Sequence, residues 1–238
     1  MRLVRAHALR CFAVLWCPAM ASCVEPTDSS PSLPDPDAID PVEGHCSAES
    51  ASTEDPFADC VEAFEPAEGV SFGHDAMPDI VLGPPQGGGE RMGGTHVASL
   101  GCGGSITLHF SDPWPIDGEG PDLVVFENAF IAGSSTFVEP AQVLVSEDGE
   151  AWYAFPCDPS AEDPEGCAGL SPVLDVDAAA DPRAAGGDAF DLADVGLEEA
   201  RYLRLVDRTF EHYQTRTWCE GAAGGFDLDA VAVLEPSS

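Results

Sequence analysis

The stretch SITLHF, at residues 105–110, alternates apolar and polar residues over its whole length. Because successive side chains of a strand point to opposite faces, the pattern places Ile106, Leu108 and Phe110 on one face and predicts a half-buried β-strand. Other short apolar or alternating runs lie at residues 123–126, 142–146, 152–155, 202–206 and 226–234. No apolar repeat of helical period is longer than two turns, and a turn or two of helix is expected only at residues 192–200.

Clusters of Gly, Pro and Asp separate these runs, as turns do in all-β proteins. The sequence EDGE at residues 147–150 predicts a tight hairpin, because Asp-Gly supplies the positive φ that such a turn needs. Many short strands in one region predict an all-β fold. We expect an antiparallel β-sandwich of jelly-roll type that closes with the strand at residues 226–234.

The first 22 residues have the composition of a signal peptide. Arginines near the start are followed by the apolar run CFAVLWC at residues 11–17, which is too short to span a bilayer. The sequence MASC at residues 20–23 resembles a bacterial lipobox and predicts lipidation of Cys23. The alternative is cleavage by ordinary signal peptidase at AMA, residues 19–21. We therefore expect an exported protein, anchored as a lipoprotein at the outer surface of the cell envelope, or secreted.

Residues 23–56 are rich in Pro, Ser, Asp and Glu and hold almost no large apolar side chain. Such a segment cannot bury a core, so we expect a disordered tether between the anchor and the folded part. Folded sequence is expected to begin near Phe57, which gives a β-sandwich domain over residues 57–236.

The chain carries 43 Asp and Glu residues against 9 basic residues, all of them Arg, and its formal net charge is -34. Nucleic acid and anionic lipid headgroups are bound by Lys and Arg, so this charge excludes them as partners. Contact with a membrane is expected only through the N-terminal lipid. Most of the acids are expected to be simply solvated, which is the plain alternative to any binding role.

Six cysteines remain beyond the expected leader and Cys23. An even number in an oxidising compartment predicts three disulfides. Cys157 and Cys167 flank one short loop and are expected to close it. Six cysteines allow fifteen pairings, which the sequence leaves open, and Cys46 with Cys60 and Cys102 with Cys219 are the next pairs we expect. A zinc site is the alternative, but no C-x-x-C and no suitably spaced His supports it.

Several segments together resemble a widespread family of bacterial cell-surface proteins whose core is akin to galactose-binding-like, discoidin-type jelly rolls. They occur in order and read VLGPP at 81–85, SLGCGGSITL at 99–108, GPDLVVFEN at 120–128, VSEDG at 145–149, GDAFDL at 187–192 and GFDLDAV at 225–231. The resemblance implies a β-sandwich displayed outside the cell, with ligand recognition rather than catalysis as its role. It names no ligand. Cys102 stands where the family pattern has Gly, which suggests a disulfide particular to a subgroup.

Carboxylates set among glycines at strand ends are candidate Ca²⁺ ligands, because Ca²⁺ takes six to eight oxygen ligands. Three sets are expected: one brackets the strand at 123–126, one lies in the sequence GGDAFD, and one shares a face of the last strand. Their members are Asp117, Asp122, Glu127 and Asn128; Asp188 and Asp191; and Asp227 and Asp229. No EF-hand is present. A bound Ca²⁺ would be structural.

Trp114, Tyr213 and Trp218 are candidate ligand-binding residues, because exposed aromatic rings beside acids stack on sugars and accept hydrogen bonds from their hydroxyls. Tyr213 and Trp218 lie in the segment RTFEHYQTRTW at residues 208–218, which is expected to be a long loop between strands. Its plain alternative is a loop held by Cys219, with its arginines paired to carboxylates.

Signatures of enzymes are absent from the sequence. There is no G-x-S-x-G elbow, no H-E-x-x-H and no phosphate-binding loop. We therefore expect a non-enzymatic binding or adhesion module at the cell surface, with a glycan or a protein as ligand. The alternatives are a carbohydrate-binding module of the envelope, a secreted hydrolase and a purely structural envelope component.

Overall fold

The computed structural model describes residue 46 and residues 55–162, 164–174, 176, 178 and 181–234. The expected signal peptide, the lipidation at Cys23 and nearly all of the expected tether lie outside the described residues. None of the helices in these described ranges has the length and apolar character needed to cross a membrane.

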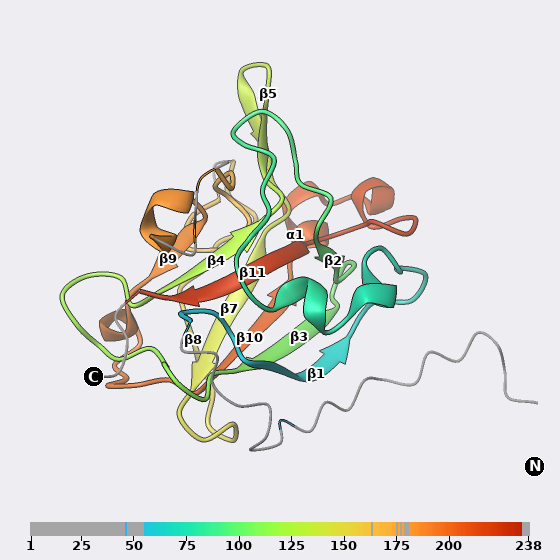
Figure 1. Cartoon of the computed structure of the whole chain (residues 1–238). Coiled ribbons are helices and arrows are strands. Elements are labelled where there is room, and N and C mark those ends of the chain that lie inside the picture. Colours follow the sequence, from blue (N-terminus) through green and yellow to red (C-terminus); the bar gives the residue numbers. More distant parts are fainter. Residues whose placement is uncertain are drawn as a thin grey trace, which may run out of the picture. The chain divides into compact units, whose positions relative to one another are not determined.

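Two antiparallel sheets make up most of the fold (Figure 1). The larger sheet has the strand order β1 (Cys60–Glu65), β3 (Ser105–His109), β10 (Tyr202–Asp207), β7 (Ala141–Ser146) and β8 (Tyr153–Ala154). The smaller has the order β2 (Ala98–Ser99), β11 (Asp227–Val233), β4 (Leu123–Glu127) and β9 (Asp188–Phe190). A hairpin of β5 (Phe130–Ala132) and β6 (Ser135–Phe137) rises at the top of Figure 1. The expectation of an all-β protein is confirmed.

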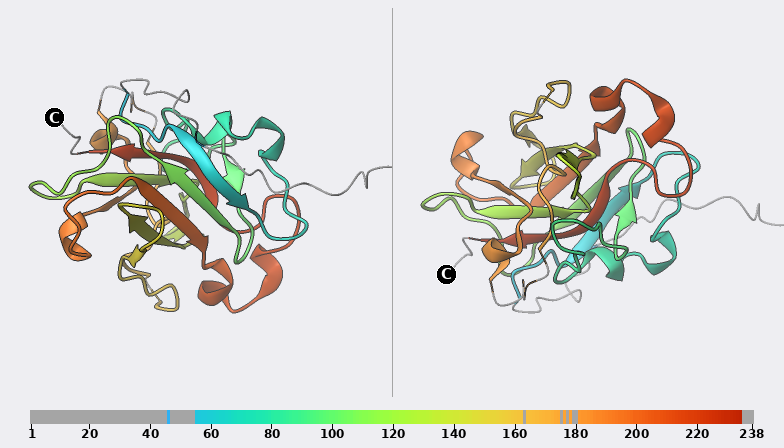
Figure 2. Two further views of the ribbon diagram at one scale, coloured as in Figure 1. Left: turned by 90° about the horizontal axis from the view of Figure 1, so that it is seen from below. Right: turned by 90° about the horizontal axis from the view of Figure 1, so that it is seen from above.

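One hydrophobic core lies between the two sheets, as Figure 2 shows with β4 and β11 in one layer and β10 in the other. Ile106, Leu108 and Phe110 all belong to it, so the alternation of SITLHF is confirmed. The larger sheet also contributes Val143, Val145, Leu203 and Leu205, and the smaller contributes Leu123, Val125, Leu228 and Val231. Each pair takes alternate positions of its strand and therefore points inward. The exception is Leu228 and Val231, which lie three residues apart on β11.

A second cluster covers the outer face of the smaller sheet, where Phe57 and Val173 pack on Val124, Phe126 and Ala230. Strand β4 is therefore buried on both faces, which explains why its sequence LVVF is apolar without alternation. The register of β11 against β4 shifts between Leu228 and Ala230. Because of this bulge, the core-facing residues are Leu228 before the shift and Val231 and Val233 after it.

The hairpin expected around EDGE is confirmed, with β7 and β8 antiparallel and Gly149 at φ 77°. Strand β8 is shorter than the expected 152–155. Helical segments are short: η1 (His74–Ala76), η2 (Asp79–Val81), η3 (Pro182–Ala185), η4 (Leu192–Asp194), α1 (Thr209–Tyr213) and η5 (Arg216–Trp218). The helical turn expected within 192–200 is η4. The segment at 208–218, expected as a loop, contains α1 and η5.

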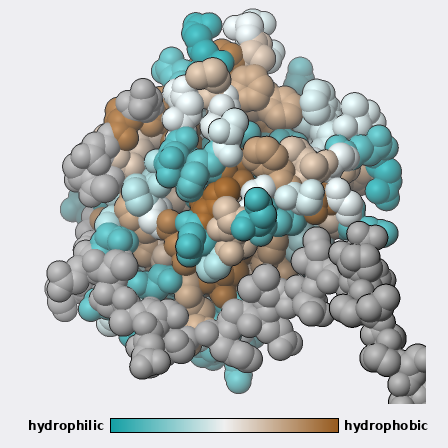
Figure 3. Space-filling view, turned by 45° about the vertical axis from the view of Figure 1, so that its right-hand side comes forward, coloured by the Kyte–Doolittle hydropathy of each residue, from teal (hydrophilic) through white to brown (hydrophobic). Residues whose placement is uncertain are grey.

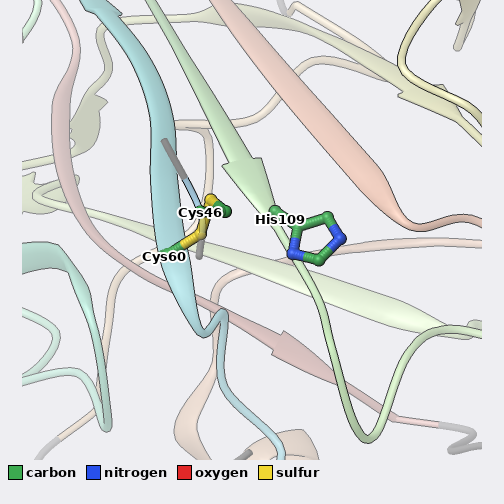
Figure 4. A group of neighbouring side chains, drawn as sticks. All are labelled: Cys46, Cys60 and His109. Atoms are coloured by element: carbon green, nitrogen blue, oxygen red, sulfur yellow. A yellow bond between two sulfur atoms is a disulfide. The ribbon is translucent and has the colours of Figure 1, made fainter. Parts of the chain in front are cut away.

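All three expected disulfides are present: Cys46–Cys60, Cys102–Cys219 and Cys157–Cys167. They indicate an oxidising, extracellular environment. His109 lies beside the first of them (Figure 4), and donor atoms of these three residues fall within 4.8 Å of one another. Both sulfurs are bonded to each other and are not thiolates, so this group is not a zinc site.

Candidate functional site

Carboxylates gather at two opposite ends of the sheets. At one end, strand β10 finishes at Asp207, whose carboxylate accepts a hydrogen bond from the N–H of Phe226, the residue before β11. At the other end, β4 begins directly after Asp122. Because β11 and β4 are antiparallel, with Leu228 opposite Glu127, the end of β4 lies at the start of β11. We call these two regions the Asp207 end and the Asp122 end.

The first expected calcium set is divided between these ends, so its four members cannot form one site. Asp117 and Asp122 precede β4, whereas Glu127 is its last residue and Asn128 follows it. An extended strand rises about 3.3 Å per residue, which separates Asp122 from Glu127 by roughly 16 Å. The prediction of a single site bracketing this strand is wrong, because a strand keeps its two ends apart.

At the Asp122 end, Asp117, Asp122 and Asp191 bring carboxylate oxygens within 4.8 Å of one another. Asp122 is fully buried and accepts hydrogen bonds from the backbone N–H groups of Gly118 (2.9 Å) and Leu192 (2.7 Å). Asp191 accepts from the Ala193 N–H at the start of η4. Burial is the main cause that raises the pKa of Asp122. These bonds fasten the loop before β4 to η4, which is a structural role.

Trp114 lies at the Asp122 end, apart from the other two aromatic candidates. Its indole Nε1 donates to Glu199 at 2.8 Å, and the Arg201 guanidinium carbon lies 3.4 Å from its ring centroid. Glu199 and Arg201 precede β10, whereas Tyr213 and Trp218 follow the other end of that strand. Trp114 packs on the main core and is covered by Arg201. The structure therefore does not group it with Tyr213 and Trp218.

A cavity of about 550 Å³ opens beside Trp114's partner Glu199. Its other lining residues are Ile116, Asp117, Glu147 and Glu198. Four of the five lining side chains are acidic, so this cavity repels anions.

The structure does not bring Asp188 together with Asp191. Asp188 opens β9 opposite Val125, and its Oδ2 accepts hydrogen bonds from the backbone N–H groups of residues 169–171 at 2.8–3.3 Å. Its carboxylate stabilises this turn. The charge is therefore already compensated by three donors.

Asp227 and Asp229 flank Leu228 in β11, where the register against β4 shifts, and both are buried. Their partners differ. Asp227 accepts hydrogen bonds from the Ser99 hydroxyl and from Asn128 Nδ2, whereas Asp229 accepts two from the Gln86 backbone N–H. Burial raises the pKa of Asp227 to about 6 and that of Asp229 to about 7.

Asp207 joins three segments at the Asp207 end. Its carboxylate accepts hydrogen bonds from the N–H groups of Gly103 (3.0 Å), Thr209 (3.1 Å) and Phe226 (2.7 Å), and from the Thr209 hydroxyl (2.7 Å). It is 1% exposed. These bonds hold the start of α1 and the start of β11 against the turn that precedes β3.

Glu127 and Glu139 are buried acids with far fewer partners. Glu127 is 2% exposed and Glu139 is 5% exposed. Oε1 of Glu127 accepts a long hydrogen bond of 3.4 Å from the Asp227 N–H, while its Oε2 is buried without any hydrogen-bond partner. No ion pair joins Glu127, Glu139 or Asp227 to a basic side chain of the described chain.

The pKa values of this pair follow from the lack of compensation. Burial, followed by the charges of Glu139 and Asp227, raises the pKa of Glu127 well above its usual range. Burial, followed by Asp227 and Asp207, raises the pKa of Glu139 to about 9. With a pKa of about 9, the Glu139 side chain holds its proton at neutral pH when no cation is beside it.

Aromatic rings cover the same end of the fold. The Phe137 ring lies 5.0 Å from that of Trp218 and 6.3 Å from that of Tyr213, and Tyr213 lies 5.5 Å from Trp218. Phe130 packs on Phe137 at 5.3 Å across the β5–β6 hairpin. We call Phe130, Phe137, Tyr213 and Trp218 the aromatic face. Trp218 is 42% exposed, so part of this face meets solvent.

A cavity of about 500 Å³ shares the β5–β6 hairpin and α1 with the aromatic face. It is lined by Ser134, Ser135, Thr136, Val138, Glu162, Pro164, Leu170 and His212. Hydroxyl, carboxylate and imidazole groups thus stand beside aromatic rings. Figure 3 shows hydrophobic residues reaching the surface among hydrophilic ones near the top of the domain, where the hairpin stands.

Sequence reasoning did not identify Glu139, Asp207 or Phe137 as members of this end. Glu139 lies between Val138 and Pro140 immediately before β7, and an acid in such apolar surroundings was the available signal. Asp207 and Phe137 carry no local signal, because their roles depend on contacts with residues far along the chain.

Comparison with known proteins adds no assignment: a scan against protein-family models and a search of curated proteins both found no match. Function is therefore argued from the geometry of the site.

Proposed function

We propose that this protein is a non-enzymatic binding module displayed outside the cell, and that its ligand is a glycan bound at the aromatic face. The observation that carries the proposal is the exposed Trp218 ring, which packs against Tyr213 and Phe137 and leaves a rigid apolar surface open to solvent. Pyranose rings present flat C–H faces that stack on such surfaces.

Polar groups beside the rings supply the second requirement for sugar recognition. Ser135, Thr136, Glu162 and His212 line the adjoining cavity, so donors and acceptors for sugar hydroxyls lie within the same region. The net charge of -34 favours neutral glycans over sulfated or phosphorylated ones, which it would repel.

Burial argues against a hydrolase, the alternative function. A pair of carboxylates with separated roles is typical of glycosidases, and the raised pKa of Glu139 would suit a general acid. A catalytic acid must touch its substrate, however, and Glu127 and Glu139 are 2% and 5% exposed. Neither lines a described cavity.

A glycan array tests the proposal, followed by titration of the best ligand. Trp218→Ala is expected to weaken binding by roughly 10- to 100-fold, because it removes an aromatic anchor. Tyr153→Ala is the matched control, since Tyr153 is 43% exposed but lies on β8, away from the aromatic face. An array without signal, or equal binding by both variants, would contradict the proposal.

We further propose that the chain is exported and lipidated at Cys23, and that its two sheets form a jelly roll of the galactose-binding type. The disulfides and the motif MASC support export. Mass spectrometry of the mature N-terminus tests lipidation, because an acylated Cys23 and an unmodified Ser22 are distinct outcomes. An experimental structure tests the jelly-roll connectivity.

A further inference from the structure

The pair Glu127 and Glu139, buried without a basic partner in the described chain, is the most unusual feature of the Asp207 end. Buried carboxylates normally accept several hydrogen bonds or pair with a base, as Asp207 does through four bonds. Oε2 of Glu127 has neither, although the residue is 2% exposed. A buried acceptor without a partner is a place where a water molecule or an ion can bind.

The surroundings identify the charge of that ligand. The charged groups that act most on Glu127 are the carboxylates of Glu139 and Asp227. Asp227 and Asp207 in turn act on Glu139. The Asp227 N–H donates to Glu127 at 3.4 Å, and the N–H of the preceding residue, Phe226, donates to Asp207, so these buried acids lie in one region. No Arg or His of the described chain forms an ion pair with Glu127, Glu139 or Asp227. A cation would balance the charge of these carboxylates once they are ionised.

Glu127, Glu139 and Asp227 offer carboxylate oxygens, which are the ligands that hard divalent ions prefer. Ca²⁺ tolerates irregular geometry and completes its shell with backbone carbonyls and water, whereas Mg²⁺ demands a tight octahedron. Glu127, Glu139 and Asp227 are not among the groups whose oxygens all lie within 4.8 Å of one another. The three carboxylates are therefore more widely spaced than those of the Asp122 end, and water would complete the shell of an ion among them.

We propose that Glu127 and Glu139 bind a Ca²⁺ ion at the Asp207 end, with Asp227 completing the charge of the site. The ion fixes the chain between the β5–β6 hairpin and β7, because Glu139 immediately precedes Pro140 and β7. The proposal does not depend on which ligand binds the aromatic face.

The three acids of the Asp122 end form the competing location. They are more compact, but each oxygen of Asp122 already accepts a backbone hydrogen bond, and none of the three carboxylates there is a buried group without a partner. The experiment must therefore distinguish the two ends.

The test is a thermal melt of the purified full chain in EDTA and in 10 mM Ca²⁺. If the Kd is about 0.1 mM, as in extracellular calcium modules, the melting temperature is expected to rise by roughly 5–10 °C. The rise should be lost in Glu139→Gln and in Glu127→Gln, which keep the side-chain volume but remove a ligand charge. Asp117→Asn is the matched control at the other end and should keep the rise.

Three results would overturn the proposal: no calcium-dependent rise in the wild-type chain, a rise that persists in Glu139→Gln and Glu127→Gln, or a rise that Asp117→Asn abolishes. The first of these results is measured on the wild-type chain and needs no variant. If one Gln variant fails to fold, the other and Asp227→Asn remain as tests, because each alters a different carboxylate.

Discussion

The Tyr213 hydroxyl donates a 2.9 Å hydrogen bond to the carbonyl of Val138, the residue that precedes Glu139. This bond links the end of α1 to the chain that enters β7, two segments 75 residues apart in sequence. The aromatic face and the buried acids are therefore adjacent parts of one structure, since Tyr213 belongs to the first and contacts the backbone next to the second.

Removing this bond gives the first prediction. Tyr213→Phe keeps the ring contacts with Phe137 and Trp218 but leaves the Val138 carbonyl without its donor, so the free energy of unfolding should fall by about 1 kcal/mol. Urea denaturation measures the loss. Tyr153→Phe, on the exposed β8, is the control and should change stability by less than about 0.5 kcal/mol. Equal effects of the two variants would show that the bond contributes nothing.

The second prediction concerns Asp207. Asp207→Asn replaces one acceptor oxygen by an NH₂ group that faces existing N–H donors, so it should lower the free energy of unfolding by about 2–4 kcal/mol. Asp117→Asn, at an exposed position, should cost less than about 0.5 kcal/mol. Comparable stability of Asp207→Asn and the wild-type chain would refute the structural role given to this carboxylate.

The third prediction is the pH dependence of stability in EDTA. The folded pKa of Glu139 is about 9, above the unfolded value near 4.3, so the unfolded chain releases this proton at lower pH than the folded chain. The stability associated with protonated Glu139 is complete below pH 4.3 and is lost progressively as the pH rises to about 9. Protonated Asp227 and Asp229 stabilise the fold in the same way, and their contributions are lost as the pH rises to about 6 for Asp227 and about 7 for Asp229.

Urea denaturation between pH 5 and 9 measures this slope, and Glu139→Gln is the control because glutamine does not titrate. The variant should lose less stability over the interval than the wild-type chain. A wild-type stability that rises with pH, or identical slopes for both proteins, would contradict the assignment.

The fourth prediction compares two disulfides. Cys102–Cys219 joins residues 117 apart in sequence, and Cys157–Cys167 joins residues 10 apart. Chain entropy predicts that the longer loop stabilises by about 2 kcal/mol more than the shorter one. Replacing each pair by Ser and measuring urea denaturation tests the order. A larger loss for the Cys157 and Cys167 double variant would mean that local strain or contacts outweigh chain entropy.

Local patterns identified much of the fold before any tertiary contact was considered. The alternation of Ile106, Leu108 and Phe110 placed these side chains in the core because the two-residue period of a strand is a property of the backbone. The turn at Gly149 was predicted for a similar reason, since few other residues adopt positive φ.

The candidate sites were predicted less well, because sequence neighbours were taken for spatial neighbours. Asp122 and Glu127 lie at opposite ends of β4, while Asp122 meets Asp191 and Glu127 lies beside Asp227. Trp114 was grouped with Trp218 by residue type, yet β10 separates them. Tyr213 and Trp218 do come together, with Phe137 from a distant hairpin.

The sequence by itself determined the all-β class and the positions of most strands, because strand period and turn chemistry are encoded within a few residues. It indicated three disulfides, but their pairing is settled by the tertiary structure. Only the tertiary structure decided which acids and rings share a site. The order β1-β3-β10-β7-β8 brings the end of β10 beside the start of β7, and the pairing of β11 with β4 places Asp227 near Glu127. Such contacts depend on how strand ends meet in space, which no local pattern records.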